Sequence, residues 1–312
     1  MKNKYVFVAL MLVAMLGVSF GLTNIYVSAT QAERDEEFVV VTSFYPMYIA
    51  TMNVIGDTEG VTLKNLSEPQ TGCLHDFQLT PADMKLLSTA DVFIINGGGI
   101  ESFMEEIAAQ YPDLVIIEAS DGLELLCGED EAHADHDHDH GDMNAHAWMS
   151  VELYRQQVAN IAAGLARADE MNSASYLAHA NEYDGKLSEL QQLLEEVRQF
   201  MPEHSEVVLL HNAYAYLAQD FDMEVAFSMD LDEERRVSAG EVAQVIEAVR
   251  HHGVQYIFAE ELYAKDMCNL IQKEVDVEII YLDPLTRGEY KADSYLDAMG
   301  ENIERIKDAI TN

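Results

Sequence analysis

The sequence predicts an α/β fold of two lobes, each with a parallel sheet, bridged by one long helix. Short β-branched runs alternate with amphipathic segments from residue 38, and the same alternation starts again at residue 207. Between the two series, residues 151–200 show no strand pattern. Alternating strands and helices are typical of parallel sheets with helical connections.

The first series contains four short strands with helices between them. We expect strands at 38–42, 61–65, 92–96 and 114–118, and helices at 46–55, 81–88 and 101–110. Pro81 suits the first position of a helix, and Thr80 before it is a good N-cap.

The second series repeats this pattern. We expect strands at 207–210, 224–227, 256–259 and 277–281, helices at 213–220, 239–251 and 265–273, and a final packing helix at 292–310. Ser238 and Glu241 form a capping box, and Gly253 is placed to end that helix.

A helix at 151–167 is followed by a longer one at 174–200, which has no proline. Its apolar residues recur at helical spacing: Leu187, Leu190, Leu193, Leu194 and Val197. About 27 helical residues would extend roughly 40 Å, the height of a domain. We therefore expect a first lobe at 37–172, a linking helix at 173–201 that is the main connection, and a second lobe at 202–312. A coiled-coil stalk is the alternative, which the short leucine stripe disfavours.

The first 32 residues form a signal peptide or an N-terminal anchor. Lys2 and Lys4 precede an apolar run at 5–22, and small residues follow at 27–32. This run of 18 mostly apolar residues is near the minimum length for crossing a bilayer, so both forms stay open. Either one predicts export, to the periplasm or to the outer face of the cytoplasmic membrane.

The charge balance favours cationic partners. The chain has 56 acidic and 18 basic side chains, a formal net charge of −38. Nucleic acids are bound by neutralising phosphates with Lys and Arg, so this surface excludes them.

Export also allows one disulfide among Cys73, Cys127 and Cys268. A Cys73–Cys127 pair is preferred to any pair with Cys268, while unpaired thiols remain the alternative.

Residues 129–142 contain seven acids, four histidines and no large apolar side chain, which predicts a loop outside the core. Imidazoles and carboxylates both bind divalent cations. We expect weak accessory metal sites at His133, His136, His138 and His140. The alternative is a solvated acidic loop with incidental histidines.

Three other histidines lie at positions where α/β proteins bind ligands. His75 and His146 each precede a predicted helix. His211 directly follows the predicted strand at 207–210, and Asp283 lies two residues after the one at 277–281. Ligands of α/β sheets bind outside the carboxyl ends of the strands. For each histidine taken alone a structural role is the more common one, and Asp283 before a proline could mark a turn. The other four, His179, His204, His251 and His252, are expected at the surface.

Four motifs in series carry a family resemblance. They are Thr71–Pro81 (TGCLHDFQLTP), Ala145–Trp148 (AHAW), His211–Leu217 (HNAYAYL) and Tyr281–Leu285 (YLDPL). In order and spacing, this set resembles the metal-binding subunits of zinc and manganese ABC importers, over about residues 37–311. Two departures are Leu74, where the family usually has Pro, and Asn144-Ala145, where it usually has Asp-Pro.

The resemblance implies two Rossmann-like lobes with the metal in the inter-lobe cleft. It implies His75 and His146 as ligands from the first lobe, and His211 and Asp283 from the second. Asp76 could be a further ligand or could orient an imidazole. We expect the ligands to line a wet cleft when no metal is bound. The protein is expected to be a monomer that delivers the metal to a membrane permease.

Three imidazoles and one carboxylate suit tetrahedral Zn²⁺, whereas Mn²⁺ prefers more oxygen ligands. In this family, a His at the position of His211 is zinc-like and a carboxylate there is manganese-like. The function expected is high-affinity zinc binding for import. A manganese-type binding protein or adhesin of the same fold is the alternative. A zinc hydrolase is disfavoured because the chain lacks His-Glu-x-x-His and Gly-x-Ser-x-Gly segments, and because a fourth protein ligand would close the site.

Overall fold

The computed structural model describes residue 15 and residues 37–67, 77–128, 143–231 and 237–311. The predicted signal peptide or anchor, apart from Met15, lies outside the described residues. So do His75, Asp76, Cys73 and the histidine-rich loop at 129–142.

The first lobe is built on a four-stranded parallel sheet with the strand order β2-β1-β3-β4. Its strands are β1 (Phe38–Thr42), β2 (Val61–Asn65), β3 (Val92–Ile95) and β4 (Val115–Glu118). Its helices are α2 (Tyr45–Ile55), α3 (Pro81–Leu87) and α4 (Met104–Gln110). All four residues of β3 are buried, as expected for a central strand with helices on both faces.

The second lobe repeats this topology, with the strand order β6-β5-β7-β8. Its strands are β5 (Glu206–Leu209), β6 (Glu224–Ser228), β7 (Tyr256–Ala259) and β8 (Glu278–Tyr281). Its helices are α7 (Ala215–Asp220), preceded by the 3-10 turn η3 (Asn212–Tyr214), α8 (Ala239–His252) and α9 (Glu261–Ile271). Two parallel α/β lobes confirm the predicted fold class.

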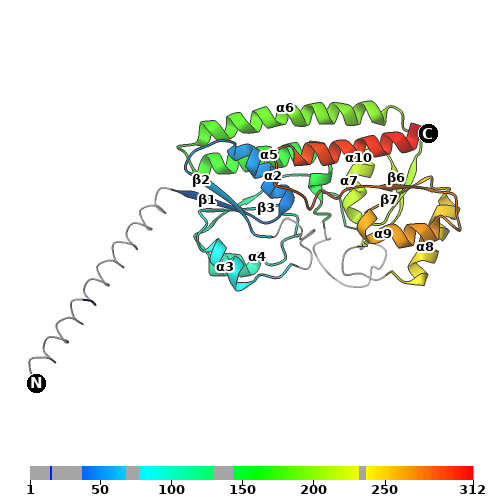
Figure 1. The fold of residues 1–312 in the computed structure, drawn as a ribbon, viewed down its shortest axis with the longest axis horizontal. Helices are drawn as coiled ribbons and strands as arrows, with labels where there is room; N and C mark the ends of the chain where they lie inside the picture. Colours follow the sequence, from blue (N-terminus) through cyan, green and yellow to red (C-terminus); the bar gives the residue numbers. More distant parts are fainter. Residues whose placement is uncertain (1–14, 16–36, 68–76, 129–142, 232–236, 312) are drawn as a thin grey trace, which may run out of the picture.

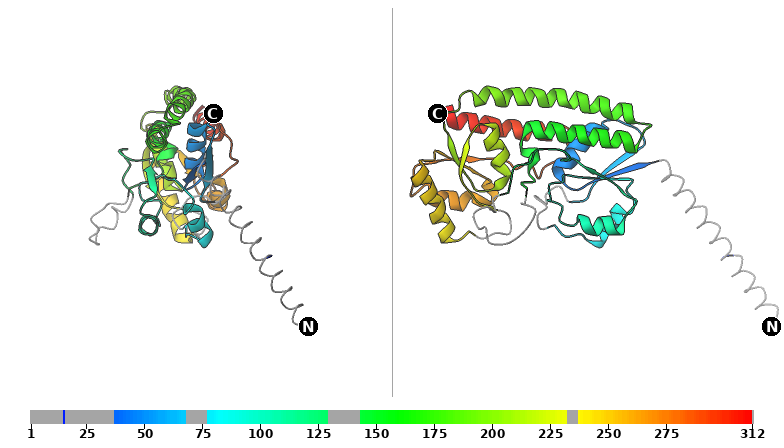
Figure 2. Two further views of the ribbon diagram at one scale, coloured as in Figure 1. Left: turned by 90° about the vertical axis from the view of Figure 1, so that its left-hand side faces the viewer. Right: turned by 180° about the vertical axis from the view of Figure 1, so that it is seen from behind.

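Three long helices cover one side of both lobes. They are α5 (Val151–Ala168), α6 (Ser173–Arg198) and α10 (Ser294–Thr311). Figures 1 and 2 show α6 running the length of the molecule, with α5 beneath it on the first lobe and α10 on the second. The predicted stripe explains this packing, since Leu187, Leu190, Leu194 and Val197 are buried and Leu193 is partly buried.

The predicted caps are confirmed. Thr80 caps α3 in a capping box with Asp83, and Ser238 caps α8 in one with Glu241. Gly253 ends α8 with φ 72°, a left-handed conformation that costs glycine little. The start of α4 was predicted wrongly, at Glu101 instead of Met104. Glu101 is only 4% exposed, and its carboxylate is used as a buried acceptor before the helix begins.

The two lobes are joined by more than α6, which corrects the expectation that this helix is the main link. One hydrophobic cluster contains residues of both sheets. Tyr154 of α5 stacks on Tyr295 of α10 with ring centroids 3.7 Å apart. Trp148, in the 3-10 turn η2 (Ala147–Met149), donates from Nε1 to the carbonyl of Pro284 at 2.9 Å.

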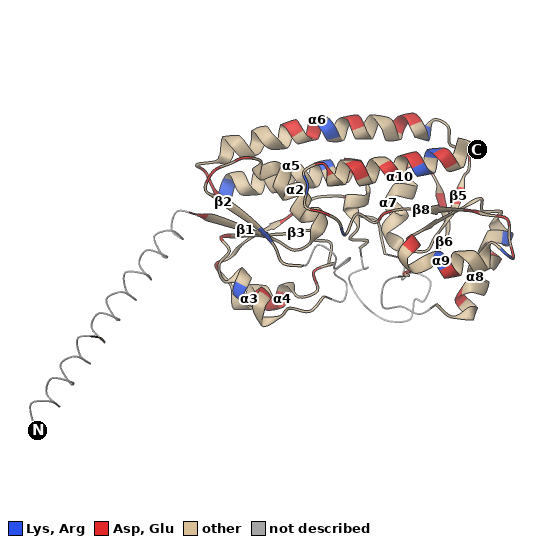
Figure 3. Ribbon diagram, in the orientation of Figure 1, with Lys and Arg blue, Asp and Glu red and all other residues tan. Residues whose placement is uncertain are grey.

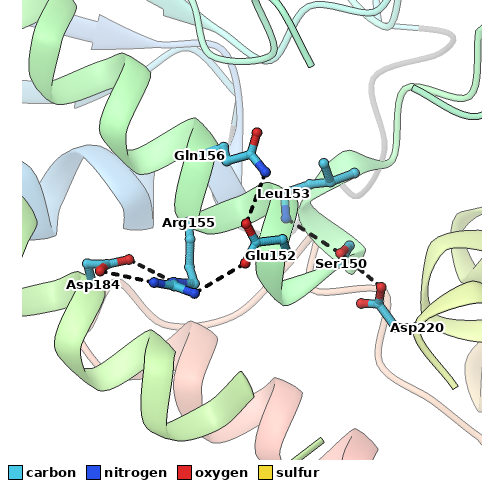
Figure 4. Close-up of polar contacts among 7 residues, drawn as sticks. All are labelled: Ser150, Glu152, Leu153, Arg155, Gln156, Asp184 and Asp220. Atoms are coloured by element: carbon cyan, nitrogen blue, oxygen red, sulfur yellow. Dashed lines mark hydrogen bonds and ion pairs between the residues drawn. The ribbon is translucent and has the colours of Figure 1, made fainter. Parts of the chain in front are cut away.

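The start of α5 makes a further contact between the lobes (Figure 4). Ser150 caps this helix and donates from Oγ to Oδ1 of Asp220 at 3.2 Å. Asp220 is the last residue of α7 in the second lobe, and burial raises the pKa of its carboxyl to about 6. One turn further along α5, Arg155 pairs with Asp184 at 2.7 Å and so connects α5 to α6.

Acidic side chains outnumber basic ones along α6 and α10 (Figure 3). This surface therefore fits a cationic partner better than a polyanion. Over the described part of the chain, no helix is both long and apolar enough to cross a membrane.

Candidate metal centre

His146 lies at the junction between the lobes, directly before η2. It is 3% exposed, and its ring contacts that of Trp148 with centroids 5.1 Å apart. The backbone of the segment that carries His146, residues 144–146, is hydrogen-bonded to other parts of the first lobe. The side chain of Asn96 donates to the carbonyl of Ala145 at 2.8 Å, and the backbone N–H of Asn144 donates to the carbonyl of Leu126, also at 2.8 Å. The segment is therefore held firmly in place.

The close packing beneath this segment depends on glycine. Gly98, after β3, has φ 65°, and a Cβ there would lie 3.3 Å from the Cα of Ala145. A side chain at position 98 would be strained and would press on the segment that carries His146.

His211 lies two residues after the end of β5, close to its predicted place at the carboxyl end of the strand, and belongs to the second lobe. It is 5% exposed. Its Nδ1 accepts the backbone N–H of Ala213 at 2.9 Å, so the imidazole acts as the N-cap of η3. The expectation that this side chain lines a wet cleft in the metal-free protein is wrong, because its ring packs against those of His146 and Tyr214 and is buried.

The structure brings His146 and His211 together. Their ring centroids are 5.2 Å apart and the ring planes are nearly perpendicular, at 88°. One ring comes from each lobe, and both are almost fully buried. Two imidazoles at this separation are within range of ligating one cation after small side-chain shifts, since Zn–N bonds are about 2.0–2.1 Å long.

The two imidazoles differ in which nitrogen carries the proton. Nδ1 of His146 lies 2.8 Å from Oδ1 of Asn144, an acceptor, so Nδ1 carries the proton and in the neutral ring Nε2 carries the lone pair. Nδ1 of His211 accepts an N–H, so in the neutral ring Nε2 carries the proton. The two rings thus place their lone pairs on different nitrogens, Nε2 in neutral His146 and Nδ1 in neutral His211.

Asp283 lies in the loop after β8, as predicted, and is half-buried. Its Oδ1 accepts the backbone N–H of Leu285 at 2.7 Å, and Leu285 has the left-handed φ of 57°. Burial raises the pKa of the Asp283 carboxyl, and the N–H of Leu285 acts in the opposite direction. Arg305 and Arg287 also lower this pKa, and a further cation nearby would offset more of the cost of burying the charge.

The structure does not assemble the full predicted set. Among the residues it describes, no group of three or more His, Cys, Asp or Glu side chains is arranged to hold a metal ion. His75, His133, His136, His138 and His140 all lie outside the described residues.

The remaining histidines are placed largely as predicted. His204, His251 and His252 are exposed. His179 is not a simple surface residue, because it is half-buried on α6 and its Nε2 lies 3.2 Å from a carboxylate oxygen of Asp57.

Two polar residues near the histidines were missed from the sequence. Asn144 contacts the His146 ring, as described above, and Asp230 has Oδ1 3.9 Å from Nδ1 of His211. Asp230 could have been found, because it follows the strand β6 and polar residues at carboxyl ends of parallel strands gather at one edge. For Asn144, the departure from the family's usual Asp-Pro was the only signal.

The cysteines leave the disulfide prediction open. Cys127 is exposed and Cys268 is buried, and neither is bonded within the described part of the chain. Cys73 lies outside the described residues.

Comparison with known proteins agrees with this architecture. Residues 40–309 match the family model described as zinc-uptake complex component A, periplasmic. The high-affinity zinc uptake system protein ZnuA of Bacillus subtilis is 27% identical over 91% of this chain and 92% of the relative. The manganese-binding lipoprotein MntA of Halalkalibacterium halodurans is 24% identical over 95% of this chain and 94% of the relative.

A solved structure has the same fold. The solute-binding protein FpvC of Pseudomonas aeruginosa, in complex with Ni²⁺, superposes with a TM-score of 0.76 at 25% identity. The match covers 88% of this chain and 97% of FpvC.

Proposed function

We propose that this chain, which belongs to the family of the periplasmic component A of zinc-uptake complexes, binds Zn²⁺ outside the cytoplasm and delivers it to the permease of an ABC importer. A binding component of this kind carries its cargo without making or breaking covalent bonds. The family assignment therefore removes the zinc hydrolase that the sequence left as an alternative.

The observation that carries the choice of zinc is the buried pair of imidazoles from the two lobes. His146 and His211 have ring centroids 5.2 Å apart. Neutral imidazole is a ligand that Zn²⁺ prefers, while Mn²⁺ is better served by oxygen. A site that begins from two imidazoles thus favours zinc.

We propose His75 and Asp283 as the other two ligands. His75 comes from the first-lobe motif that resembles the family. Asp283 is supported by its place at the carboxyl end of β8 and by a hydrogen-bonded link nearby, since Trp148 donates to the carbonyl of Pro284. The loop of Asp283 is thereby tied to the turn that follows His146. We also propose weak accessory binding at His133, His136, His138 and His140.

Manganese remains the second candidate, because MntA is similar over almost the whole chain and is named as a manganese-binding lipoprotein. The residue at position 211 distinguishes the two. A carboxylate there would add the oxygen that Mn²⁺ prefers, whereas this chain has an imidazole. An adhesin of the same fold is a further alternative, which growth of a deletion strain in chelated medium would separate from a zinc importer.

We further propose that the chain acts as a monomer and does not bind nucleic acid. The net charge of −38 supports the second point, because a polyanion would be repelled. The leader at 1–32 supports export, with a cleaved signal and a retained anchor both compatible with action at the outer face of the cytoplasmic membrane.

The direct test is the metal content of protein purified without an affinity tag, followed by competition between Zn²⁺ and Mn²⁺ against a chromophoric chelator. We expect one tightly held zinc and a clear preference over manganese. His146→Gln should lose tight binding, while the exposed His251→Gln serves as the matched control. His211→Glu should move the preference toward manganese. Tight binding that survives His146→Gln would refute the site.

A further inference from the structure

The segment that carries His146 is held by polar contacts from both lobes, and Asn144 makes most of them. Its backbone carbonyl accepts the hydroxyl of Tyr216, which belongs to α7 of the second lobe. The same hydroxyl oxygen accepts the backbone N–H of Leu126 at 3.0 Å. At 3% exposure, Asn144 is also among the most buried polar residues of the molecule.

The side-chain amide of Asn144 has only one orientation that satisfies its neighbours. Its Oδ1 accepts the backbone N–H of His146 at 3.1 Å, and a backbone N–H can only donate. Its Nδ2 donates to the backbone carbonyl of Asn212 at 3.0 Å, and a carbonyl can only accept. A flipped amide would place a donor against a donor and an acceptor against an acceptor. The oxygen therefore faces His146.

This orientation determines the tautomer of His146. The oxygen that accepts the backbone N–H of His146 also lies 2.8 Å from Nδ1 of its ring. Because the oxygen can only accept, Nδ1 must carry the proton, and in the neutral ring the lone pair is left on Nε2. Asn212 follows His211, so the same amide also connects the two loops that carry the paired imidazoles.

We propose that Asn144 is the positioning residue of the metal centre, whose amide selects the ring nitrogen that His146 presents to the metal. This inference rests on the proposed metal-binding function but makes a separate claim about the metal-free protein. Groups that hold the second nitrogen of a ligating histidine fix its tautomer and orientation, and their loss typically weakens metal binding about 10–100-fold.

Asn144→Ala and Asn144→Asp separate this role from general packing. The alanine variant has no acceptor for Nδ1–H, whereas the aspartate variant keeps one. Asn160→Ala is the matched control, because Asn160 also donates its amide to two backbone carbonyls, those of Ala119 and Asp121, at a place on α5 away from both histidines.

The first measurement is ¹⁵N NMR of metal-free protein with labelled histidines at neutral pH, with the His146 signals assigned from His146→Gln. We expect the Nδ1–H tautomer in the wild type, in Asn144→Asp and in Asn160→Ala, and loss of this preference in Asn144→Ala. An unchanged tautomer in a folded Asn144→Ala would overturn the inference. An Nε2–H tautomer in the wild type would overturn it even if Asn144→Ala did not fold.

The second measurement is zinc affinity by chelator competition. We expect Asn144→Ala to bind about 10–100-fold more weakly, with Asn144→Asp closer to the wild type and Asn160→Ala unchanged. Equal losses in Asn144→Ala and Asn160→Ala would show a packing effect and contradict the inference. If the wild type bound no metal while the tautomer responded as expected, the proposed function would fail and the role of Asn144 in setting the tautomer would stand.

Discussion

Replacing His211 by alanine tests the contribution of the second lobe to metal binding. The substitution removes one of the two paired imidazoles, and in the metal-free protein it also removes the acceptor for the N–H of Ala213. Both effects can be read from thermal unfolding, with and without zinc.

The two magnitudes are different enough to be separated. Losing the N-cap acceptor costs about 0.5–2 kcal/mol, typically about 1 kcal/mol, so the metal-free variant should melt roughly 2–4 °C lower for each kcal/mol lost. Zinc at a thousandfold excess over Kd stabilises the wild type by about 4 kcal/mol, which corresponds to a rise of roughly 8–16 °C. Most of this rise should vanish in His211→Ala.

The assay is calorimetry or fluorescence-monitored melting at several zinc concentrations. His251→Ala is the matched control, since His251 is exposed in the last turn of α8 and should keep the full zinc-induced rise. If His211→Ala rose with zinc as much as the wild type, His211 would not be a ligand, and the argument for zinc over manganese would fail with it.

Three further predictions concern the loop, the pH and a buried carboxyl. Deleting residues 129–142 should lower the zinc stoichiometry in excess metal and leave the tightest site intact. Cys127 and Met143 pair in an isolated antiparallel β-bridge, so a short turn can replace the deleted loop. Loss of tight binding would contradict the assignment of the tight site to the residues between the lobes. Zinc affinity should fall as the pH drops from about 7 to 5, because protonated imidazole cannot ligate, and calorimetry in buffers of different ionisation enthalpy should detect released protons. Burial raises the Asp220 pKa from 3.8 to about 6, so this carboxyl stabilises the fold most below pH 3.8 and loses that contribution as the pH rises through 6. Asp220→Asn, which keeps an acceptor for Ser150, should therefore stabilise the protein at pH 7 by at most about 3 kcal/mol, at about 1.4 kcal/mol per pKa unit, and this gain should disappear in melts near pH 4.

The elements of the fold could be predicted because local patterns and packing agree. β1, β2 and β7 have the expected limits, and the leucine stripe of α6 is buried as its spacing indicates. Strand periodicity and helix caps are properties of short segments, so a single sequence contains them. The start of α4 is different, because glutamate is a good helix former and the sequence gives no reason to exclude Glu101. In the structure its carboxylate accepts the buried N–H groups of Asn96 and Gly97, and the helix begins after it.

The candidate site could be predicted only in part. The position of His211 after a strand indicated the carboxyl end of a sheet, and the structure places it there. Its role as the cap of η3 is a local contact, two residues along the chain, that was missed from the sequence. Its burial depends on how the two lobes pack against each other, which no local pattern contains. The same is true of the bond between Asn144 and Asn212, which joins residues 68 positions apart.

The two paired histidines are unequally prepared for a metal. The amide of Asn144 leaves the lone pair of His146 on Nε2, within a segment already held by Asn96 and Tyr216. His211 must give up the N–H of Ala213 whichever nitrogen it uses: if Nδ1 ligates, its lone pair goes to the metal, and if Nε2 ligates, the proton has to move to Nδ1. If both histidines are ligands as proposed, binding would therefore require more rearrangement at His211 than at His146. A shared core, the Trp148–Pro284 bond and the Tyr154–Tyr295 stack already fix the lobes relative to each other. If the site is as proposed, metal binding would act mainly on the turn after β5 among the described residues, since the two lobes are already in contact.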